Sequence, residues 1–154
     1  MPTSLEPILA GHPFCKNLEQ RYLQLLVGCA SNVVFRPSEQ IFRMDEQTDR
    51  FYLIRSGKIA IELYVPVRGS VTVETLSEGD ILGWSWLIPP YRSAFSARAV
   101  ELTHAVGIDG KCLRGKCESD HDLGYELFKR VAPILVHRLE ATRLQLLDLY
   151  RTEG

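Results

Sequence analysis

Apolar and polar positions follow two different periods along the first part of the chain, and each period predicts a different kind of element. In NLEQRYLQLLVGC (17–29), apolar side chains recur every three or four residues, which predicts a helix capped by Asn17 and ended by Gly28. After it, short stretches rich in β-branched and aromatic residues alternate with turn formers. The clearest of these predicted strands are residues 33–35, 40–42, 51–54 and 58–65.

A hairpin is the clearest feature of the β-rich region. KIAIELYV (58–65) carries apolar residues at every second position, PVRGS (66–70) turns the chain, and VTVETL (71–76) returns. Two further strands are expected within SAFSARAVELTHAVGID (93–109). Strands that recur about every 8 to 12 residues are typical of a sandwich or a small barrel. We therefore expect a mainly β fold with flanking α-helices.

After Asp109 the apolar pattern becomes helical and stays so to the end of the sequence. Pro133 lies inside this region and must either kink one helix or separate two. An apolar seam with one polar member runs along the helix through Phe128, Val131, Leu135, Leu139, Thr142, Leu146 and Leu149. A seam close to a heptad repeat favours a homodimer formed through residues 125–150. Packing of the same face on the chain's own strands is the alternative.

Length, composition and charge narrow the function classes. A chain of 154 residues with 45% hydrophobic and 24% charged residues is typical of one globular domain. No apolar run approaches the length of about 20 residues that spans a membrane. The N-terminus lacks a signal-peptide pattern, so we expect a cytoplasmic protein without membrane contact. The net charge is −1 without a basic cluster, so we expect no direct DNA binding by this chain.

The sequence contains four cysteines: Cys15, Cys29, Cys112 and Cys117. In a cytoplasmic protein we expect them to be reduced thiols. The spacing in KCLRGKC (111–117) differs from the C-x-x-C of zinc and redox motifs. A metal or redox role for Cys112 and Cys117 would draw on His104 and His121, but free cysteine is more commonly a small core residue. The sequence shows no H-x-H pair, nucleophile elbow or Walker motif. We therefore predict no metal site, no catalytic residues and no enzymatic activity.

Four motifs together resemble the cyclic-nucleotide-binding domain of the Crp/Fnr regulators. They are RFYLIRSGKIAI (50–61), LSEGDILG (76–83), YRSAFSARAV (91–100) and HRLEATRLQLL (137–147). The resemblance runs from about residue 13 to residue 150 and implies a double-stranded β-helix, or jelly roll, with a long C-terminal dimer helix. We expect a single domain over residues 1–154. It would comprise an N-terminal helical segment (1–30), a β-roll (31–110) and C-terminal helices (111–152).

The resemblance also implies a phosphate cassette that binds a small anionic ligand, with cAMP or cGMP as the default. The resemblance implies that Gly83 lets the backbone approach the ligand and that the N–H groups of residues 84–86 face the phosphate. Arg92 would meet the phosphate with its planar guanidinium group. The residue expected to contact the purine is Thr142. The implied ligand-binding residues are Gly83, Trp84, Ser85, Arg92, Ser93 and Thr142.

This sequence departs from the family pattern at the cassette. Nucleotide-binding members carry a glutamate after the cassette glycine, which accepts a hydrogen bond from the ribose, whereas this sequence has Trp84. Losing a buried hydrogen-bond partner costs about 1–3 kcal/mol, so we expect weaker nucleotide binding. Trp84 and Trp86 could stack on a flat ligand or fill the roll. Ser38 and Asp45 stand where the family often has turn glycines.

The resemblance therefore implies a ligand-sensing regulatory domain that binds its ligand in the β-roll and signals through the C-terminal helix, as in transcription regulation. The alternative is a non-binding module, with its pocket filled by Trp84, that serves as a dimerisation or protein-docking subunit. Crp/Fnr regulators continue past the dimer helix into a helix-turn-helix. This sequence has none, so we expect either a stand-alone sensory domain or a DNA-binding part beyond it.

Overall fold

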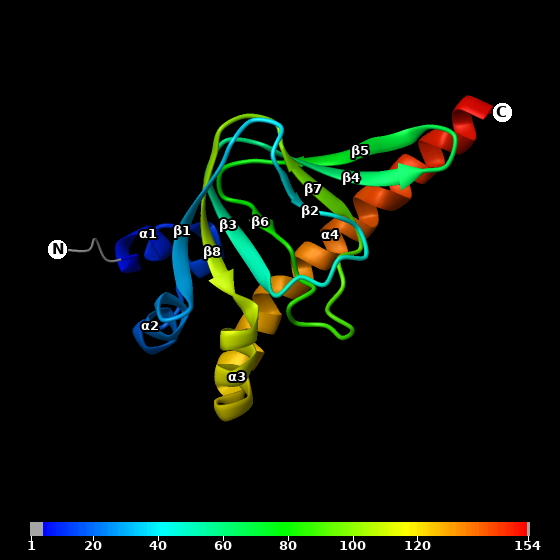
Figure 1. The fold of residues 1–154 in the computed structure, drawn as a ribbon. Helices are drawn as coiled ribbons and strands as arrows, with labels where there is room; N and C mark the ends of the chain where they lie inside the picture. The colour runs from blue at the N-terminus through cyan, green and yellow to red at the C-terminus, as the bar shows by residue number, and fades with distance from the viewer. Residues whose placement is uncertain (1–4, 154) are drawn as a thin grey trace.

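The computed structural model describes the backbone of residues 5–153 and the side chains of residues 5–148. Three short helical elements come first: α1 (Glu6–Ala10), η1 (Pro13–Cys15) and α2 (Gln20–Val27). The strands of the described chain are β1 (Ala30–Phe35), β2 (Gln40–Phe42), β3 (Arg50–Ser56), β4 (Ile59–Val65), β5 (Gly69–Leu76), β6 (Ile81–Leu82), β7 (Ser96–Ala99) and β8 (Thr103–Asp109). Two helices follow: α3 (Gly110–Ser119) and α4 (His121–Glu153). In Figure 1 the strands form a roll, and α4 runs from α3 toward the β4–β5 hairpin.

The strands form two antiparallel four-stranded sheets, in the orders β1-β8-β3-β6 and β2-β7-β4-β5. The predicted hairpin is confirmed, because β4 pairs with β5 from Ile59 opposite Leu76 to Val65 opposite Gly69. Each strand predicted from the apolar pattern is present, as β1, β2, β3 and β4, with ends shifted by at most a few residues. The mainly β fold with flanking helices and a long C-terminal helix is confirmed.

The predicted start of the first long helix is wrong. Helix α2 begins at Gln20 with Glu19 as its N-cap residue, not at Asn17. Asn17 instead adopts a left-handed backbone (φ 63°), which asparagine tolerates better than most residues and which a helix cap does not use. The predicted end is confirmed, because Gly28 is the C-cap residue.

Helix α4 continues through Pro133, so this proline does not separate two helices. Some residues of the apolar seam pack on the chain itself, and others are left exposed, as pairing with a second copy would require. Val131 is fully buried and Leu135 is half-buried against the core, whereas Leu139 and Leu146 are more than half exposed. Val131 and Leu135 of the seam therefore pack on the chain itself, whereas Phe128 before them and Leu139 and Leu146 after them are more than half exposed. The side chain of Leu149 lies outside the described residues.

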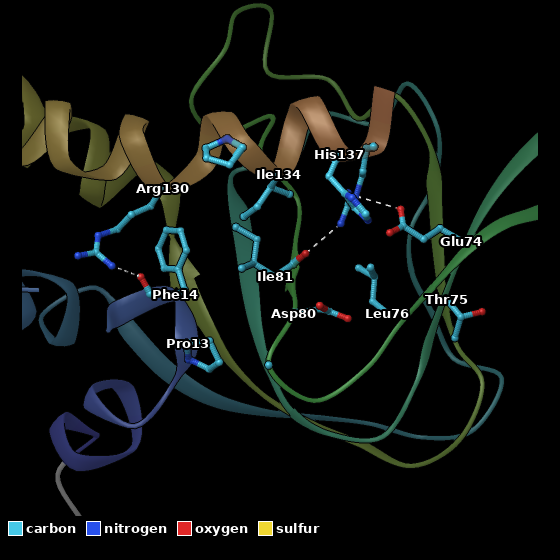
Figure 2. Close-up of a pocket in the computed structure, with 13 residues that line it drawn as sticks. Pro13, Phe14, Glu74, Thr75, Leu76, Asp80, Ile81, Arg130, Ile134 and His137 are labelled. Carbon is cyan, nitrogen blue, oxygen red and sulfur yellow. Dashed lines mark hydrogen bonds and ion pairs between the residues drawn. The ribbon is translucent and has the colours of Figure 1, made fainter. Parts of the chain in front are cut away.

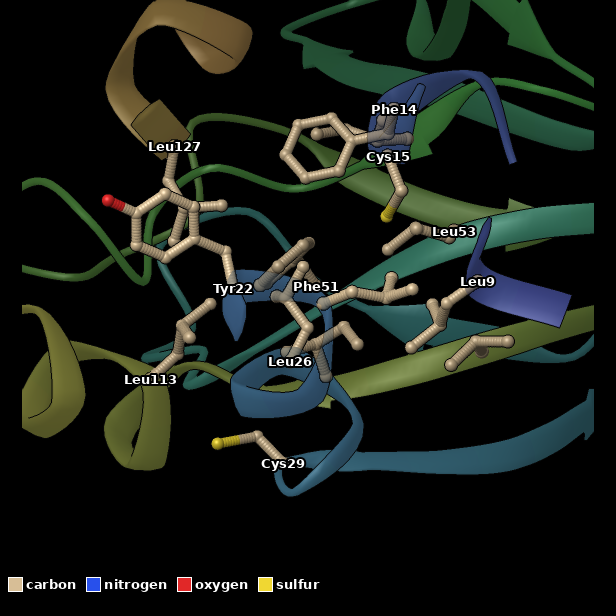
Figure 3. Packing of buried hydrophobic residues seen from close by; sticks show 14 of the residues in the cluster. Leu9, Phe14, Cys15, Tyr22, Leu26, Cys29, Phe51, Leu53, Leu113 and Leu127 are labelled. Carbon is tan, nitrogen blue, oxygen red and sulfur yellow. The ribbon is translucent and has the colours of Figure 1, made fainter. Parts of the chain in front are cut away.

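The largest core cluster joins the helices to the sheet that contains β3 and β8 (Figure 3). Trp86 lies in this cluster with no exposed surface, and its ring stacks on that of Phe51 at 4.8 Å between centroids. Gly110, the first residue of α3, packs directly against Trp86: a Cβ at this position would lie 2.3 Å from the Trp86 Cβ. The core therefore fixes Trp86 and the start of α3 against each other.

Gly110→Ala is expected to destabilise the protein by about 1–3 kcal/mol, because a methyl group there overpacks the core. Gly115→Ala is a matched control in the same helix, since a Cβ there meets nothing within 4 Å. This control is expected to stabilise the protein by up to about 1 kcal/mol through helix propensity. Urea unfolding of both variants checks the pair, and equal effects would contradict the close packing of Gly110 on Trp86.

The expectation that all cysteines are reduced is wrong for two of them, since Cys29 and Cys112 form a disulfide. Backbone pairing brings them together: the Asp109 N–H donates to the Cys29 carbonyl oxygen at 2.9 Å, three residues before Cys112. Cys15 and Cys117 are free. Burial raises the pKa of the Cys15 thiol to about 11 and also raises that of Cys117, so neither is a reactive thiolate near neutral pH.

Candidate functional site

The segment between β6 and β7, residues 83–95, forms the candidate cassette. Gly83 has a φ of 95°, which favours glycine, and its backbone passes close to β3. A turn follows, closed by a hydrogen bond from the Leu87 N–H to the Trp84 carbonyl oxygen at 3.0 Å. Two further left-handed residues, Ser38 and Asp45, occupy the expected turn positions without glycine (φ 72° and 69°). The Asp45 N–H donates to the Ser93 carbonyl oxygen at 2.8 Å, which anchors the end of the cassette.

The two tryptophans of the cassette have different environments. Trp86 fills the core, as the packing interpretation requires. Trp84 is half-buried and lies edge-on to Phe95, with 5.1 Å between ring centroids. Trp84 also lines a cavity of about 360 Å³ between the roll and α4. We call this space the roll–helix cavity.

The roll–helix cavity is lined by β4, β5, the cassette and α4. Among the six expected ligand-binding residues, Trp84 and Thr142 line it. The Thr142 hydroxyl donates to the Arg138 carbonyl oxygen at 2.9 Å, so its lone pairs remain available as acceptors. A ligand in this cavity would therefore touch both the roll and the long helix.

The remaining expected residues, Gly83, Ser85, Arg92 and Ser93, do not line this cavity. Ser93 is buried and its hydroxyl hydrogen-bonds with the Phe95 backbone. Ser85 is also buried, and its hydroxyl lies 2.9 Å from that of Thr48. Arg92 is exposed, and its Nη1 donates to the Asp45 carbonyl oxygen at 2.8 Å. In the described conformation these three side chains brace the cassette.

Arg138 is the residue of the cavity that the sequence did not reveal. Its side chain is nearly buried; Nε lies 3.2 Å from Glu74 Oε2, and Nη2 donates to the Ile81 carbonyl oxygen at 3.0 Å. Its guanidinium carbon lies 4.6 Å from the Trp84 ring centroid, a cation–π geometry. Burial lowers the pKa of the Arg138 guanidinium from its usual value, and the Glu74 carboxylate partly offsets this. The feature of the sequence that could have identified Arg138 is its position four residues before Thr142, on the same helix face.

A second cavity, of about 570 Å³, is lined by residues of η1, β5, β6 and α4 (Figure 2). Arg138 and Glu74 line both cavities and form the wall between them. At the far end Arg130 donates from Nη1 to the Phe14 and Lys16 carbonyl oxygens, at 2.7 and 2.8 Å. Arg130 therefore ties η1 to α4 and is already engaged.

The described residues contain no group of three or more histidine, cysteine, aspartate or glutamate side chains that could hold a metal ion. Among them, too, no helix has the length and hydrophobicity needed to cross a membrane.

The sequence model of the family described as "Cyclic nucleotide-binding domain" matches residues 32–120. A CRP-like cAMP-activated global transcriptional regulator of Mycobacterium tuberculosis is 25% identical over 149 residues. The match covers 97% of this chain and 65% of that regulator, so the chain spans about two thirds of the length of the curated relatives it matches.

Solved structures share the fold. A candidate cyclic nucleotide-binding protein from Geobacter metallireducens is 28% identical, with a TM-score of 0.78 over 89% of this chain and 98% of that one. The Thermus thermophilus catabolite activator protein is 21% identical, with a TM-score of 0.70 over 90% of this chain and 63% of that one. With the roll, the cassette and the long helix in place, the family match over residues 32–120 shows that this chain belongs to the cyclic nucleotide-binding domain family.

Proposed function

We propose that this chain is a ligand-sensing regulatory domain that binds a small anionic ligand in the roll–helix cavity and signals through α4. One observation carries the proposal: the cavity is lined by the roll and by α4 together. A ligand that contacts both elements more favourably in one arrangement of α4 than in another shifts the population of that arrangement. This is a binding role, and we propose no enzymatic activity.

Cyclic nucleotides, cAMP or cGMP, are the default ligands of this proposal, bound more weakly than in relatives that carry the glutamate. The proposed contacts are Trp84 and Thr142, which line the cavity, together with Gly83, Ser85, Arg92 and Ser93, which do not line it and would meet the ligand only after the cassette rearranges. For Arg92 to take part, its side chain must leave the Asp45 carbonyl oxygen. That rearrangement has a low cost, because Arg92 is exposed.

Thermal unfolding with and without millimolar cAMP or cGMP tests this binding directly. A ligand that binds only the folded protein raises the midpoint temperature by mass action, so even weak binding is measurable. We expect a rise with the wild-type protein that disappears in Arg92→Ala. No rise with either nucleotide would remove the nucleotide version of the proposal.

The pocket-filled alternative has one specific observation in its favour. Arg138 already lies over the Trp84 ring, and both side chains line the cavity. In this alternative the chain is a dimerisation or docking subunit without a ligand. The same unfolding experiment separates the two, since the alternative predicts no response to any small anion.

We further propose a homodimer through residues 125–150, in a cytoplasmic protein that does not itself bind DNA. Exposed apolar side chains lie along α4 at Val136, Leu139, Leu144, Leu146 and Leu147, each more than half exposed. Burying such a stripe against a second copy would remove it from water.

The double variant Leu144→Glu/Leu147→Glu is expected to convert the dimer to a monomer, because like charges would face each other across the helix pair. Leu102→Glu, at a similarly exposed leucine between β7 and β8, is the control and should stay dimeric. Analytical ultracentrifugation gives the mass of each. A wild-type protein that is monomeric at all concentrations would refute the dimer.

A further inference from the structure

One of the two cysteines in the Cys29–Cys112 disulfide is accessible from outside the core. Cys112 is half-buried and lines a cavity of about 570 Å³ between α2 and α3, which we call the α2–α3 cavity. Cys29 is buried, with 8% of its surface exposed. Exposed disulfides are the more easily reduced ones and include the regulatory ones. A thiol can therefore approach Cys112 in the folded protein.

The charged side chains of the α2–α3 cavity favour an attacking thiolate. Three charged residues line the cavity, namely Arg21, Lys116 and Asp120. Arg21 forms a salt bridge with Asp120, whereas Lys116 forms none with the described residues and donates from Nζ to the Leu25 carbonyl oxygen at 3.0 Å. Lys116 also follows Cys112 by four residues, on the same face of α3. A nearby cation stabilises a thiolate, which is the form that attacks a disulfide.

Two contacts of α3 hold the cassette, one on each side of Cys112 along the helix. Gly110 packs on Trp86 so closely that a Cβ there would lie 2.3 Å from the Trp86 Cβ. Arg114 donates from Nη1 to the Trp86 carbonyl oxygen, and its guanidinium carbon lies 4.0 Å from the centroid of the Tyr91 ring. Since Cys112 is two residues away from each of these contacts, the disulfide fixes the part of α3 that touches the cassette.

We propose that the Cys29–Cys112 disulfide is a site of reversible exchange with a dithiol reductant, and that its redox state controls how firmly α3 holds the cassette. In the cytoplasmic protein proposed above, disulfides are rare, and those that occur are usually transient and catalytic or redox-sensing. The inference goes beyond the proposed function, because it adds a redox input to the cassette that requires no bound ligand.

The dithiol alone balances the exchange. A thiolate of the reductant attacks the sulfur of Cys112, the more accessible cysteine, and forms a mixed disulfide while the Cys29 sulfur leaves and takes up a proton. The second thiolate of the reductant then attacks the reductant's own sulfur in the mixed disulfide, which releases Cys112 as a thiol. The reductant is oxidised to a disulfide, and the protein gains two electrons and two protons.

Reduction of the folded protein tests the exchange. After millimolar dithiothreitol without denaturant, alkylation and mass spectrometry should find new free thiols at Cys29 and Cys112, and oxidised glutathione should restore the bond. In Cys29→Ala, oxidised glutathione should form a mixed disulfide at Cys112. In Cys112→Ala the buried Cys29 should form one about tenfold more slowly or slower still. A bond that opens only in denaturant, or two cysteines that are already free in the untreated protein, would overturn the inference.

Hydrogen exchange of the oxidised and the reduced protein tests the link to the cassette. The amides of Leu87, Tyr91 and Ser93 are hydrogen-bonded within or beside the cassette and serve as reporters. Reduction should accelerate their exchange by about tenfold or more, the scale of losing one hydrogen bond to a charged group. The amides of the β4–β5 hairpin, which does not touch α3 through these contacts, should change less.

Arg114→Met separates this link from a general loss of stability. It removes the donor to the Trp86 carbonyl oxygen and leaves both cysteines in place, so the reporters should exchange fast in both redox states. Lys111→Met, at an exposed lysine of the same helix, is the matched control and should respond to reduction as the wild type does.

The outcomes separate this inference from the proposed function. Reversible reduction of the folded protein with faster exchange in the cassette supports the inference, whether or not a nucleotide binds. Equal exchange in both redox states overturns the control of the cassette. Binding of cAMP to a protein whose disulfide never opens without denaturant overturns the inference and leaves the proposed function standing. A reversible redox response without any response to a small anion overturns the proposed function alone.

Discussion

Trp84→Glu is expected to raise the affinity for cAMP by about 5- to 150-fold over the wild-type protein. Two causes act together. The substitution removes a bulky ring from the wall of the roll–helix cavity. It also supplies a carboxylate at the position where nucleotide-binding members of the family that this chain resembles carry the glutamate that accepts a hydrogen bond from the ribose. The new carboxylate would also lie near Arg138, which now covers the Trp84 ring.

Trp84→Gln and Trp84→Leu are the controls for Trp84→Glu. Glutamine has nearly the same shape without the charge, and leucine opens space without offering an acceptor. Calorimetric titration of all three with cAMP should rank Glu above Gln and Gln above Leu. Equal affinities for the three would mean that only the bulk of Trp84 limits nucleotide binding. If all three variants bound cAMP with the affinity of the wild-type protein, the nucleotide would bind outside the roll–helix cavity.

Breaking the Cys29–Cys112 disulfide is expected to destabilise the protein by about 4 kcal/mol. The two cysteines are separated by 83 positions, so the bond closes a long loop and restricts the unfolded chain strongly. For a protein of this size the loss corresponds to a fall of roughly 10 °C in the unfolding midpoint. The bond ties the end of α2 to α3, on which the packing of Trp86 depends.

The double variant Cys29→Ala/Cys112→Ala and the wild type in dithiothreitol should show the same lowered midpoint. Adding reductant to the double variant should change nothing further. Cys117→Ala controls for the loss of a thiol, since Cys117 is free and half-buried. A wild-type midpoint insensitive to reductant, with free thiols at Cys29 and Cys112 by mass spectrometry, would contradict the bond.

The strands were predictable because their signal is local. Alternating apolar positions in 58–65 and the turn that follows determine β4 and the hairpin without any distant contact. The two-residue strand β6 carries no period of its own, and only the motif around it indicated its place. The helix start at Gln20 was missed because Asn17 fits a left-handed turn as well as it fits a cap.

The parts of the site that were missed depend on contacts between distant segments. The disulfide joins residues that only the β1–β8 pairing brings together, and a search within KCLRGKC could not find Cys29. In the sequence alone, Arg138 is one more charged residue of an amphipathic helix. Only the fold brings it into contact with Glu74 and Trp84. Arg92, conversely, was expected at the ligand, whereas its side chain is exposed and hydrogen-bonded to the Asp45 backbone.

Fluorescence of Trp84 is the most direct measure of ligand binding in the roll–helix cavity. The sequence contains two tryptophans, so Trp86→Phe leaves Trp84 as the sole reporter, half-buried at the cavity wall. Titration with cAMP, cGMP and benzoate should give a saturable change with at least one of them. A signal that stays flat through the millimolar range with all three, in a protein that unfolds cooperatively, would contradict ligand sensing in this cavity.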